Sequence, residues 1–336
     1  MKVLRLHSVQ DLRLHHEPVP QPLQGEVLIR VKAVGICGSD LHWFAEEGIG
    51  DARLAKPLVL GHEFAGVIAG GPRQGERVAI DPCITCGKCE FCLHGHPNLC
   101  IAHDFAGHGL TDGGMREYLC WPEGFLFALP DNISDEDGAM LEPLGVALHT
   151  IDLGHLRTGM TVGIFGCGPI GLLAIQLARL SGATQVIATD KLPHRLEAAH
   201  SVGADLVIQA VAGSCESEAV LAATKGRGVD VALEIAGENE AVETAIAAAK
   251  PGGCVVLAGI PAEDHTTFTA SVARRKGLTL RLVRRMKHTY PRAIRLVEKG
   301  LIDVRSIVTA CFPIDESEQA FKMANEREGL KIVINP

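Results

Sequence analysis

Four cysteines stand at short, regular spacing in the first half of the chain: Cys86, Cys89, Cys92 and Cys100. The segment around them, residues 81–100, is polar and contains Gly, His and Pro, so ordinary helix or strand packing would not hold it. Four thiolates closing tetrahedrally on one zinc ion fill its coordination shell, and such sites are structural. An iron–sulfur cluster also takes four thiolates, and redox-active or simply reduced thiols are a further alternative. Cys83 is a fifth thiol nearby, either a bystander or a replacement for Cys86.

Three further residues offer the ligand types of a different zinc site. Cys37 follows a strand-like run, residues 26–34, and His62 and Glu63 stand side by side between two apolar runs. One thiolate, one imidazole and one carboxylate leave the fourth position of a zinc ion open, as catalytic zinc sites require. The alternatives are a small buried cysteine and a polar turn.

A carboxylate opens an apolar helical pattern further on. Glu142 precedes Pro143, which suits a first helical turn, and the pattern continues to Leu153. Glu142 either interacts with the helix dipole or faces the metal and its bound water.

A glycine fingerprint follows in the second half. The run Gly166-Cys167-Gly168-Pro169-Ile170-Gly171 lies between a strand-like segment, residues 161–165, and a helical one, residues 172–180. This context is typical of a turn that brings backbone close to a pyrophosphate. Asp190 ends the next predicted strand, where an acid accepts hydrogen bonds from ribose hydroxyls and repels a 2′-phosphate. We therefore expect NAD in preference to NADP, although the basic residues that follow weaken that preference: Lys191, His194 and Arg195.

The elements that would position these residues fall into two groups. Short β-rich runs separated by Pro and Gly occupy the first 80 residues and predict a β-rich or barrel-like domain. Strands alternate with helices from residue 161 to residue 259, the rhythm of a doubly wound parallel sheet. Helices are predicted at 291–299, ending at Gly300, and at 316–327. A last strand, residues 331–334, is predicted to rejoin the first domain.

Bulk composition limits the function. The chain has 336 residues, 47% of them hydrophobic, and a net charge of −8. That charge argues against nucleic acid and anionic membranes as partners, and it argues against a zinc-ribbon nucleic-acid binder. No segment has the length of a membrane helix, and the first residues lack the long apolar core of a signal peptide. The number of cysteines, eleven, is odd, and five of them lie between residues 83 and 100, which favours metal binding over a disulfide framework. We expect a cytoplasmic protein.

Together these motifs resemble the zinc-dependent medium-chain alcohol dehydrogenases over essentially the whole chain. Within that superfamily the chain is most similar to the polyol (sorbitol, xylitol, L-iditol) dehydrogenases, on three further segments: Ile49-Gly50-Asp51, Glu142-Pro143-Leu144 and Thr289-Tyr290-Pro291-Arg292. The resemblance implies a GroES-like catalytic domain, residues 1–150 and 290–336, and a Rossmann domain, residues 151–289.

The resemblance also implies an activity: hydride transfer from a secondary alcohol of a sorbitol-like polyol to NAD, giving a ketose. Catalytic zinc would be held by Cys37, His62 and Glu63, with Glu142 holding the metal-bound water or substrate. Zinc lowers the pKa of the substrate hydroxyl, and the proton would leave through Ser39 and His42 or through Glu142. The remaining implied contacts are those to substrate, Trp43 and Arg285, and those to cofactor, Arg195, Ala258 and Val283, beside the glycine turn and Asp190.

Two departures from the polyol pattern qualify this assignment. Trp43 stands where these enzymes commonly have tyrosine, and Met286 stands where they have tyrosine after the arginine. A threonine or simple alcohol dehydrogenase is therefore one alternative, and a non-catalytic NAD- and zinc-binding protein is another. The family habit predicts a homo-oligomer, dimer or tetramer. The basic residues Arg281, Arg284, Arg285, Lys287 and His288 form either a solvated face or a surface for phosphate or substrate hydroxyls.

Overall fold

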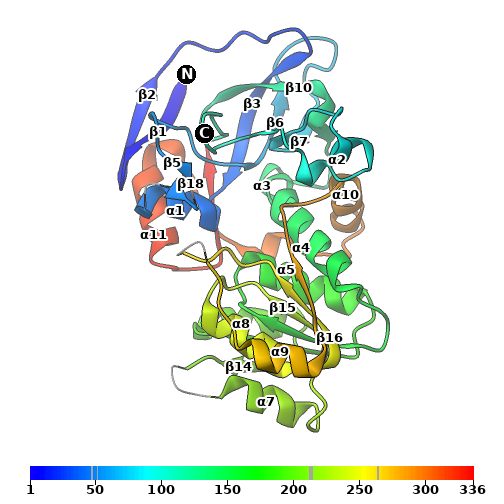
Figure 1. Ribbon diagram of the computed structural model, residues 1–336. Helices are drawn as coiled ribbons and strands as arrows, with labels where there is room; N and C mark the ends of the chain where they lie inside the picture. Colours follow the sequence, from blue (N-terminus) through cyan, green and yellow to red (C-terminus); the bar gives the residue numbers. More distant parts are fainter. Residues whose placement is uncertain (47, 51, 212–214, 263–264) are drawn as a thin grey trace. The chain divides into compact units, whose positions relative to one another are not determined.

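The computed structural model describes residues 1–46, 48–50, 52–211, 215–262 and 265–336 (Figure 1). Asp51, which contributed to the polyol resemblance, lies outside the described residues. The chain divides into two compact units, Met1–Gly145 with Lys287–Pro336, and Val146–Met286. The boundary falls inside one helix, α4 (Leu141–Gly154).

The first unit is built on a seven-stranded, mostly antiparallel sheet. Its order is β11-β7-β6-β3-β19-β18, with β10 also paired to β3. The strand bounds are β3 (Glu26–Gly35), β6 (Glu63–Ile68), β7 (Arg77–Ile80), β10 (Tyr118–Pro122), β11 (Leu126–Ala128), β18 (Val308–Pro313) and β19 (Lys331–Asn335). The prediction that the last strand returns to the first domain is confirmed, because β19 pairs with β3.

Short elements surround this sheet. Two-stranded pairs are formed by β1 (Lys2–Ser8) with β2 (Asp11–His16), β4 (Gly48–Ile49) with β5 (Ala52–Arg53), and β8 (Cys83–Ile84) with β9 (Asp104–Phe105). The helices are α1 (Gly38–Glu46), α2 (Glu90–Leu93), α3 (Asp135–Ala139), α10 (Tyr290–Glu298) and α11 (Ser317–Asn325). Local sequence explains several ends: Ser134 and Asp137 form a capping box on α3, and Gly300 adopts a left-handed φ of 63° just after α10.

The second unit is a six-stranded parallel sheet in the order β14-β13-β12-β15-β16-β17. Its strands are β12 (Thr161–Phe165), β13 (Gln185–Asp190), β14 (Leu206–Gln209), β15 (Val229–Glu234), β16 (Ala249–Leu257) and β17 (Thr279–Leu282). The helices are α5 (Pro169–Leu180), α6 (Pro193–Ser201), α7 (Glu216–Ala223), α8 (Asn239–Ala248) and α9 (Ala270–Lys276). This is the strand order of dinucleotide-binding folds, so the predicted α/β class with a doubly wound sheet is confirmed.

Element bounds differ from the prediction where special backbone occurs. α5 begins at Pro169 instead of residue 172, because proline fits the first helical position. β16 begins at Ala249, directly after α8, and the irregular register between Val229 and Val231 accommodates its first residues. No helix among the described residues is long and apolar enough to cross a membrane.

Candidate active site

The side chains of Cys37, His62 and Glu63 meet in the first unit. β3 and β6 run antiparallel with Gly35 opposite Glu63, so the residues just after β3 and just before β6 are neighbours. One ligand atom from each residue lies within 4.8 Å of the others. Bonds of about 2.0–2.3 Å to a tetrahedral zinc place ligand atoms about 3–4 Å apart, so the cluster fits one ion. His62 is 6% exposed and Glu63 is 1% exposed, whereas Cys37 is half-buried, so the cluster is accessible from the side of the cysteine.

Asp40 orients this cluster, a role the sequence analysis missed. Its carboxylate accepts hydrogen bonds from the backbone N–H of Cys37 at 2.9 Å and of Gly61 at 3.1 Å. Its Oδ1 also lies 3.5 Å from Nδ1 of His62. Burial acts to lower the pKa of His62, but the Asp40 and Cys37 charges outweigh it and the pKa is raised. A carboxylate that contacts the ring nitrogen facing away from the metal fixes the orientation and the tautomer of a metal-binding histidine. The position of Asp40, three residues after Cys37, is the feature of the sequence that could have indicated this role.

Lys331 is the second residue that was missed. Its Nζ donates to both carboxylate oxygens of Glu63, at 2.8 and 2.5 Å, and to the carbonyl oxygen of Ile36 at 2.9 Å. Burial acts to lower the pKa of Lys331, yet Glu63 raises it overall, so the ammonium stays charged. Gly35 makes room for the pair, since a Cβ there would lie 2.2 Å from Oε2 of Glu63. A separation of 268 residues between lysine and glutamate hides this contact from local sequence patterns.

Glu142 is buried at the start of α4, in the same unit. Burial raises the pKa of its carboxyl to about 8, with the charges of His62 and Lys331 acting against the shift. A bound zinc ion would also favour the carboxylate, because a nearby cation lowers a carboxyl pKa. Glu142 thus titrates in the electrostatic field of the Cys37–His62–Glu63 cluster.

The two predicted relay residues lie on or beside α1. Ser39 Oγ is 3.3 Å from Nε2 of His62, so it reaches the cluster directly. His42 places Nδ1 3.1 Å from Oε2 of Glu46, one helical turn on. His42 therefore has a surface partner, and its relay role stays a prediction.

The predicted substrate contacts differ in setting. Trp43 is 1% exposed and stacks edge-on against His108 within the core of the first unit, so packing already accounts for a large aromatic side chain there. Arg285 follows β17 in the second unit and has a φ of +53°, unusual for a residue other than glycine. Substrate contact by either residue stays a prediction.

The four clustered cysteines converge as the spacing predicts. Their ligand atoms form one group, and the Sγ atoms of three pairs are separated by 3.5 to 3.9 Å: Cys89–Cys92, Cys100–Cys86 and Cys89–Cys100. Thiolates on one zinc are about 3.8 Å apart, whereas a disulfide needs about 2.0 Å. The pKa of Cys86 is lowered, most of all by a hydrogen bond from the backbone N–H of Lys88. The pKa of Cys89 is lowered as well, most of all by a hydrogen bond from the backbone N–H of Cys92. These distances suit a single ion better than an iron–sulfur cube, and Cys83 stands apart in β8.

The glycine turn between β12 and α5 has one open position. A Cβ on Gly166 would lie 2.7 Å from the backbone nitrogen of Ala236, and one on Gly171 would lie 2.0 Å from the carbonyl oxygen of Gly166. At Gly168, in contrast, the nearest atom would be Nη1 of Arg195 at 3.8 Å. The outer glycines are required for packing, and the middle one leaves the backbone accessible to a pyrophosphate.

The other predicted cofactor contacts also lie at the carboxyl ends of the parallel strands. Asp190 ends β13, Ala258 follows β16 and Val283 follows β17. Asp190 accepts hydrogen bonds from the backbone N–H of Cys167 at 2.7 Å and of Leu192 at 2.9 Å. Because a carboxylate has about four acceptor sites, two remain for ribose hydroxyls.

Comparison with known proteins assigns the class. Residues 23–131 match the family model of the alcohol dehydrogenase GroES-like domain, and residues 169–299 match that of zinc-binding dehydrogenases. Fold and site thus define a zinc-binding dehydrogenase, and the GroES-like fold predicted for the first domain is confirmed. The chain belongs to the zinc-binding medium-chain alcohol dehydrogenase family.

Individual relatives cover nearly the full length. The chain is 35% identical to a sorbitol dehydrogenase of Bacillus subtilis (strain 168) over 344 residues, covering 100% of this chain and 97% of the relative. It is 34% identical to a probable D-xylulose reductase A of Aspergillus terreus over 340 residues, covering 98% and 96% respectively.

Solved structures agree with this assignment. A 2R,3R-butanediol dehydrogenase from Bacillus subtilis superposes with a TM-score of 0.88 at 30% identity, covering 100% of this chain and 99% of that one. A zinc-binding dehydrogenase from Sinorhizobium meliloti 1021 bound to NADP superposes with a TM-score of 0.90 at 32% sequence identity, with the same coverage of both chains. An alcohol dehydrogenase from Escherichia coli CFT073 complexed with NADH superposes with a TM-score of 0.91 at 29% sequence identity, again with that coverage. Relatives of this fold therefore bind either nicotinamide cofactor.

Proposed function

We propose that this protein oxidises a secondary alcohol group of a sorbitol-like polyol to a ketone, with NAD as the hydride acceptor. The observation that carries the proposal is the cluster of Cys37, His62 and Glu63, with one ligand atom from each within 4.8 Å. The near full-length similarity to a sorbitol dehydrogenase supports the choice of substrate class. A protein with no catalytic task has no physical need for a three-ligand zinc site that leaves one position open.

Each residue of the cluster has a distinct task in this proposal. Cys37, His62 and Glu63 hold the metal, Asp40 fixes the His62 ring, and Lys331 sets the position of the Glu63 carboxylate. Bound zinc supplies Lewis acidity that lowers the pKa of the substrate hydroxyl, and bound NAD supplies the hydride acceptor. The four-cysteine lobe holds a second, structural zinc that takes no part in the reaction.

Glu142 is the residue we assign to proton movement or to the metal-bound water. Its support is burial close enough to His62 and Glu63 for their charges to act on its pKa. Ser39, 3.3 Å from Nε2 of His62, is the first candidate for the outward path. Glu142→Gln keeps the shape of the side chain and removes its titration, so kcat should fall at least tenfold while the Kd for NADH stays unchanged. Unchanged turnover would remove Glu142 from the reaction.

NAD is preferred in this proposal because Asp190 lies at the end of β13 with free acceptor capacity. A 2′-phosphate at that place would meet a carboxylate that is 8% exposed, at a cost in electrostatic repulsion. Arg195, with Nη1 4.0 Å from Oδ2 of Asp190, partly offsets that repulsion. We therefore expect preference for NAD without complete exclusion of NADP.

The experiment that tests the substrate assignment is a panel of initial rates with NAD and with NADP. Sorbitol, xylitol, 2,3-butanediol, ethanol and threonine are compared at equal concentrations. Highest kcat/KM on a pentitol or hexitol supports the proposal. Highest kcat/KM on threonine, ethanol or butanediol keeps the zinc chemistry and overturns the polyol assignment.

A homo-oligomeric state is the remaining part of the proposal. β17 is an edge strand of its sheet, and Leu282 on it is 76% exposed. Exposed edge strands with apolar side chains favour association with another chain. Sedimentation velocity should give a dimer or tetramer, and a monomer at micromolar concentration would exclude it.

A further inference from the structure

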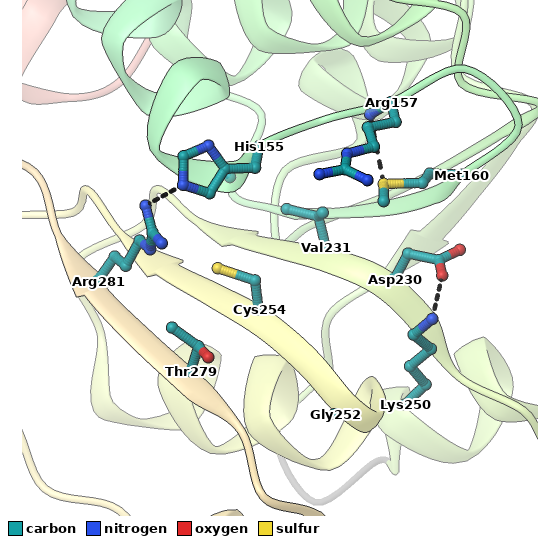
Figure 2. A pocket seen from close by; sticks show the side chains of 11 residues that line it. His155, Arg157, Met160, Asp230, Val231, Lys250, Gly252, Cys254, Thr279 and Arg281 are labelled. Atoms are coloured by element: carbon teal, nitrogen blue, oxygen red, sulfur yellow. Dashed lines mark hydrogen bonds and ion pairs between the residues drawn. The ribbon is translucent and has the colours of Figure 1, made fainter.

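A small pocket opens at the amino end of the parallel sheet in the second unit (Figure 2). Its walls come from the end of α4 and the segment that leads into β12, and from the first residues of β15, β16 and β17. The cofactor turn follows the carboxyl end of β12. Because all six strands are parallel, the pocket lies at the amino ends of the strands and the turn lies at their carboxyl ends. The pocket is therefore separate from the dinucleotide site.

Positive charge dominates the lining of this pocket, although the chain as a whole has a net charge of −8. Three lining residues are cations, Arg157, Lys250 and Arg281, and Asp230 is the single carboxylate among them. Figure 2 shows Arg281 with His155 at one side and Asp230 with Lys250 at the other, with Val231 and Cys254 between them.

The one carboxylate is already neutralised. Asp230 Oδ1 lies 2.6 Å from Nζ of Lys250 and 2.6 Å from Nη2 of Arg227, and its Oδ2 accepts the backbone N–H of Thr161 at 2.9 Å. Burial acts to raise the pKa of Asp230, but these hydrogen bonds hold it below its usual range. With both Lys250 and Arg227 assigned to Asp230, the charges of Arg157 and Arg281 remain uncompensated.

These two arginines differ in how they are held. Arg281 Nη1 donates to Nε2 of His155 at 2.6 Å, which holds one guanidinium against an imidazole. The guanidinium of Arg157 has no hydrogen-bond or ion-pair partner within the described part of the chain. The pocket thus combines one positioned and one unengaged guanidinium, and guanidinium groups suit bidentate binding of phosphate oxygens.

We propose that this pocket binds a compact dianion of the phosphate type, with Arg157 and Arg281 as its principal contacts. Its volume of about 200 Å³ is below the ~300–1,000 Å³ of pockets for drug-sized ligands. The space suits inorganic phosphate or a small phosphate ester and excludes a second dinucleotide. Lys250 adds positive charge at the rim. Occupancy of the pocket would tie the strand starts of β15, β16 and β17 to the segment before β12.

Calorimetric titration of the full-length, zinc-loaded protein with inorganic phosphate tests the proposal. Saturating NADH occupies the dinucleotide site, and chloride keeps the ionic strength constant. Arg157→Ala/Arg281→Ala should weaken phosphate binding at least tenfold. A matched control, Arg274→Ala/Arg275→Ala, removes the same charge from exposed positions on α9 of the same unit and should leave binding unchanged. Arg157→Lys/Arg281→Lys keeps the charge without the bidentate fork, so its affinity should lie between those of the wild type and the alanine variant.

Two results would overturn the proposal. Equal phosphate affinity in the wild type and the Arg157→Ala/Arg281→Ala variant would assign the anion to another site, the zinc included. Absence of phosphate binding by the wild type would exclude the pocket altogether. A parallel titration with glycerol 3-phosphate distinguishes the source of the ligand, since tighter binding that the alanine variant also loses identifies a phosphate ester. Unchanged Kd for NADH and unchanged Tm without phosphate show that each variant is folded.

Discussion

Replacement of Lys331 by methionine should destabilise the metal-free protein far more than the zinc-loaded one. Lys331 is 4% exposed and Glu63 is 1% exposed, and the lysine donates to both oxygens of that carboxylate. Methionine preserves the length and apolar stem of the side chain and removes the charge. In the metal-free protein, Glu63 is then left as a buried carboxylate without its cation.

The magnitude follows from what compensates Glu63 in each state. Loss of one partner of a buried ion pair costs about 3–5 kcal/mol. When zinc is bound, the metal compensates the carboxylate, and the loss reduces to the hydrogen bond with Ile36, roughly 1–2 kcal/mol. The difference, about 2–3 kcal/mol, appears as tighter zinc binding by the variant, since stability and binding are linked.

Urea unfolding followed by tryptophan fluorescence measures this effect in the relevant unit. The chain has two tryptophans, and both Trp43 and Trp121 are buried in the core of the first unit, so the signal reports that unit alone. Lys322→Met, on the exposed face of α11, is the matched control and should change stability by less than ~0.5 kcal/mol in either state. Equal destabilisation of the Lys331→Met variant with and without zinc would refute the argument, because it would show that zinc and Lys331 do not compete for Glu63.

Three further predictions concern the other clusters. Cys92→Ser removes one of the four converging thiolates, so elemental analysis should find one zinc per chain in place of two, with NADH binding retained; two zinc ions would place the metal elsewhere. Gly171→Ala should abolish NADH binding and lower Tm, because its Cβ would lie 2.0 Å from the carbonyl oxygen of Gly166. Gly168→Ala should weaken NADH binding but leave Tm unchanged, because the nearest atom to its Cβ would be 3.8 Å away. Asp190→Ser should lower the ratio of kcat/KM for NAD to that for NADP about tenfold, and an unchanged ratio would show that Asp190 does not face the ribose.

Much of this site was accessible from sequence because its signals are local. The four cysteines lie within 15 residues of one another, and the glycine fingerprint is bounded by a strand and a helix that periodicity predicts. The pairing of Cys37 with His62 and Glu63 needed more, since only the antiparallel register of β3 and β6 brings them together. Their residue types suggested the grouping, with a buried cysteine and a polar turn as alternatives, and the resemblance to a known family favoured the zinc site.

The residues that sequence reasoning missed act through long-range contacts or through backbone. Lys331 reaches Glu63 from the last strand, and nothing near residue 331 indicates a metal site. Asp40 stands close to Cys37 in the sequence. However, the two hydrogen bonds that its carboxylate accepts from backbone N–H groups depend on the conformation of residues 37–40 and 61. The charged pocket at the amino end of the second sheet gathers residues from four separate segments, so only the folded topology defines it.

The most direct test of the central claim is NADH formation from sorbitol, followed by absorbance, on one preparation in three states: as purified, after removal of zinc by a chelator, and after zinc is restored. We predict activity that disappears with the metal and returns with it, while the Kd for NADH is the same in all three states. Activity that survives complete loss of zinc from the Cys37–His62–Glu63 cluster would contradict the account.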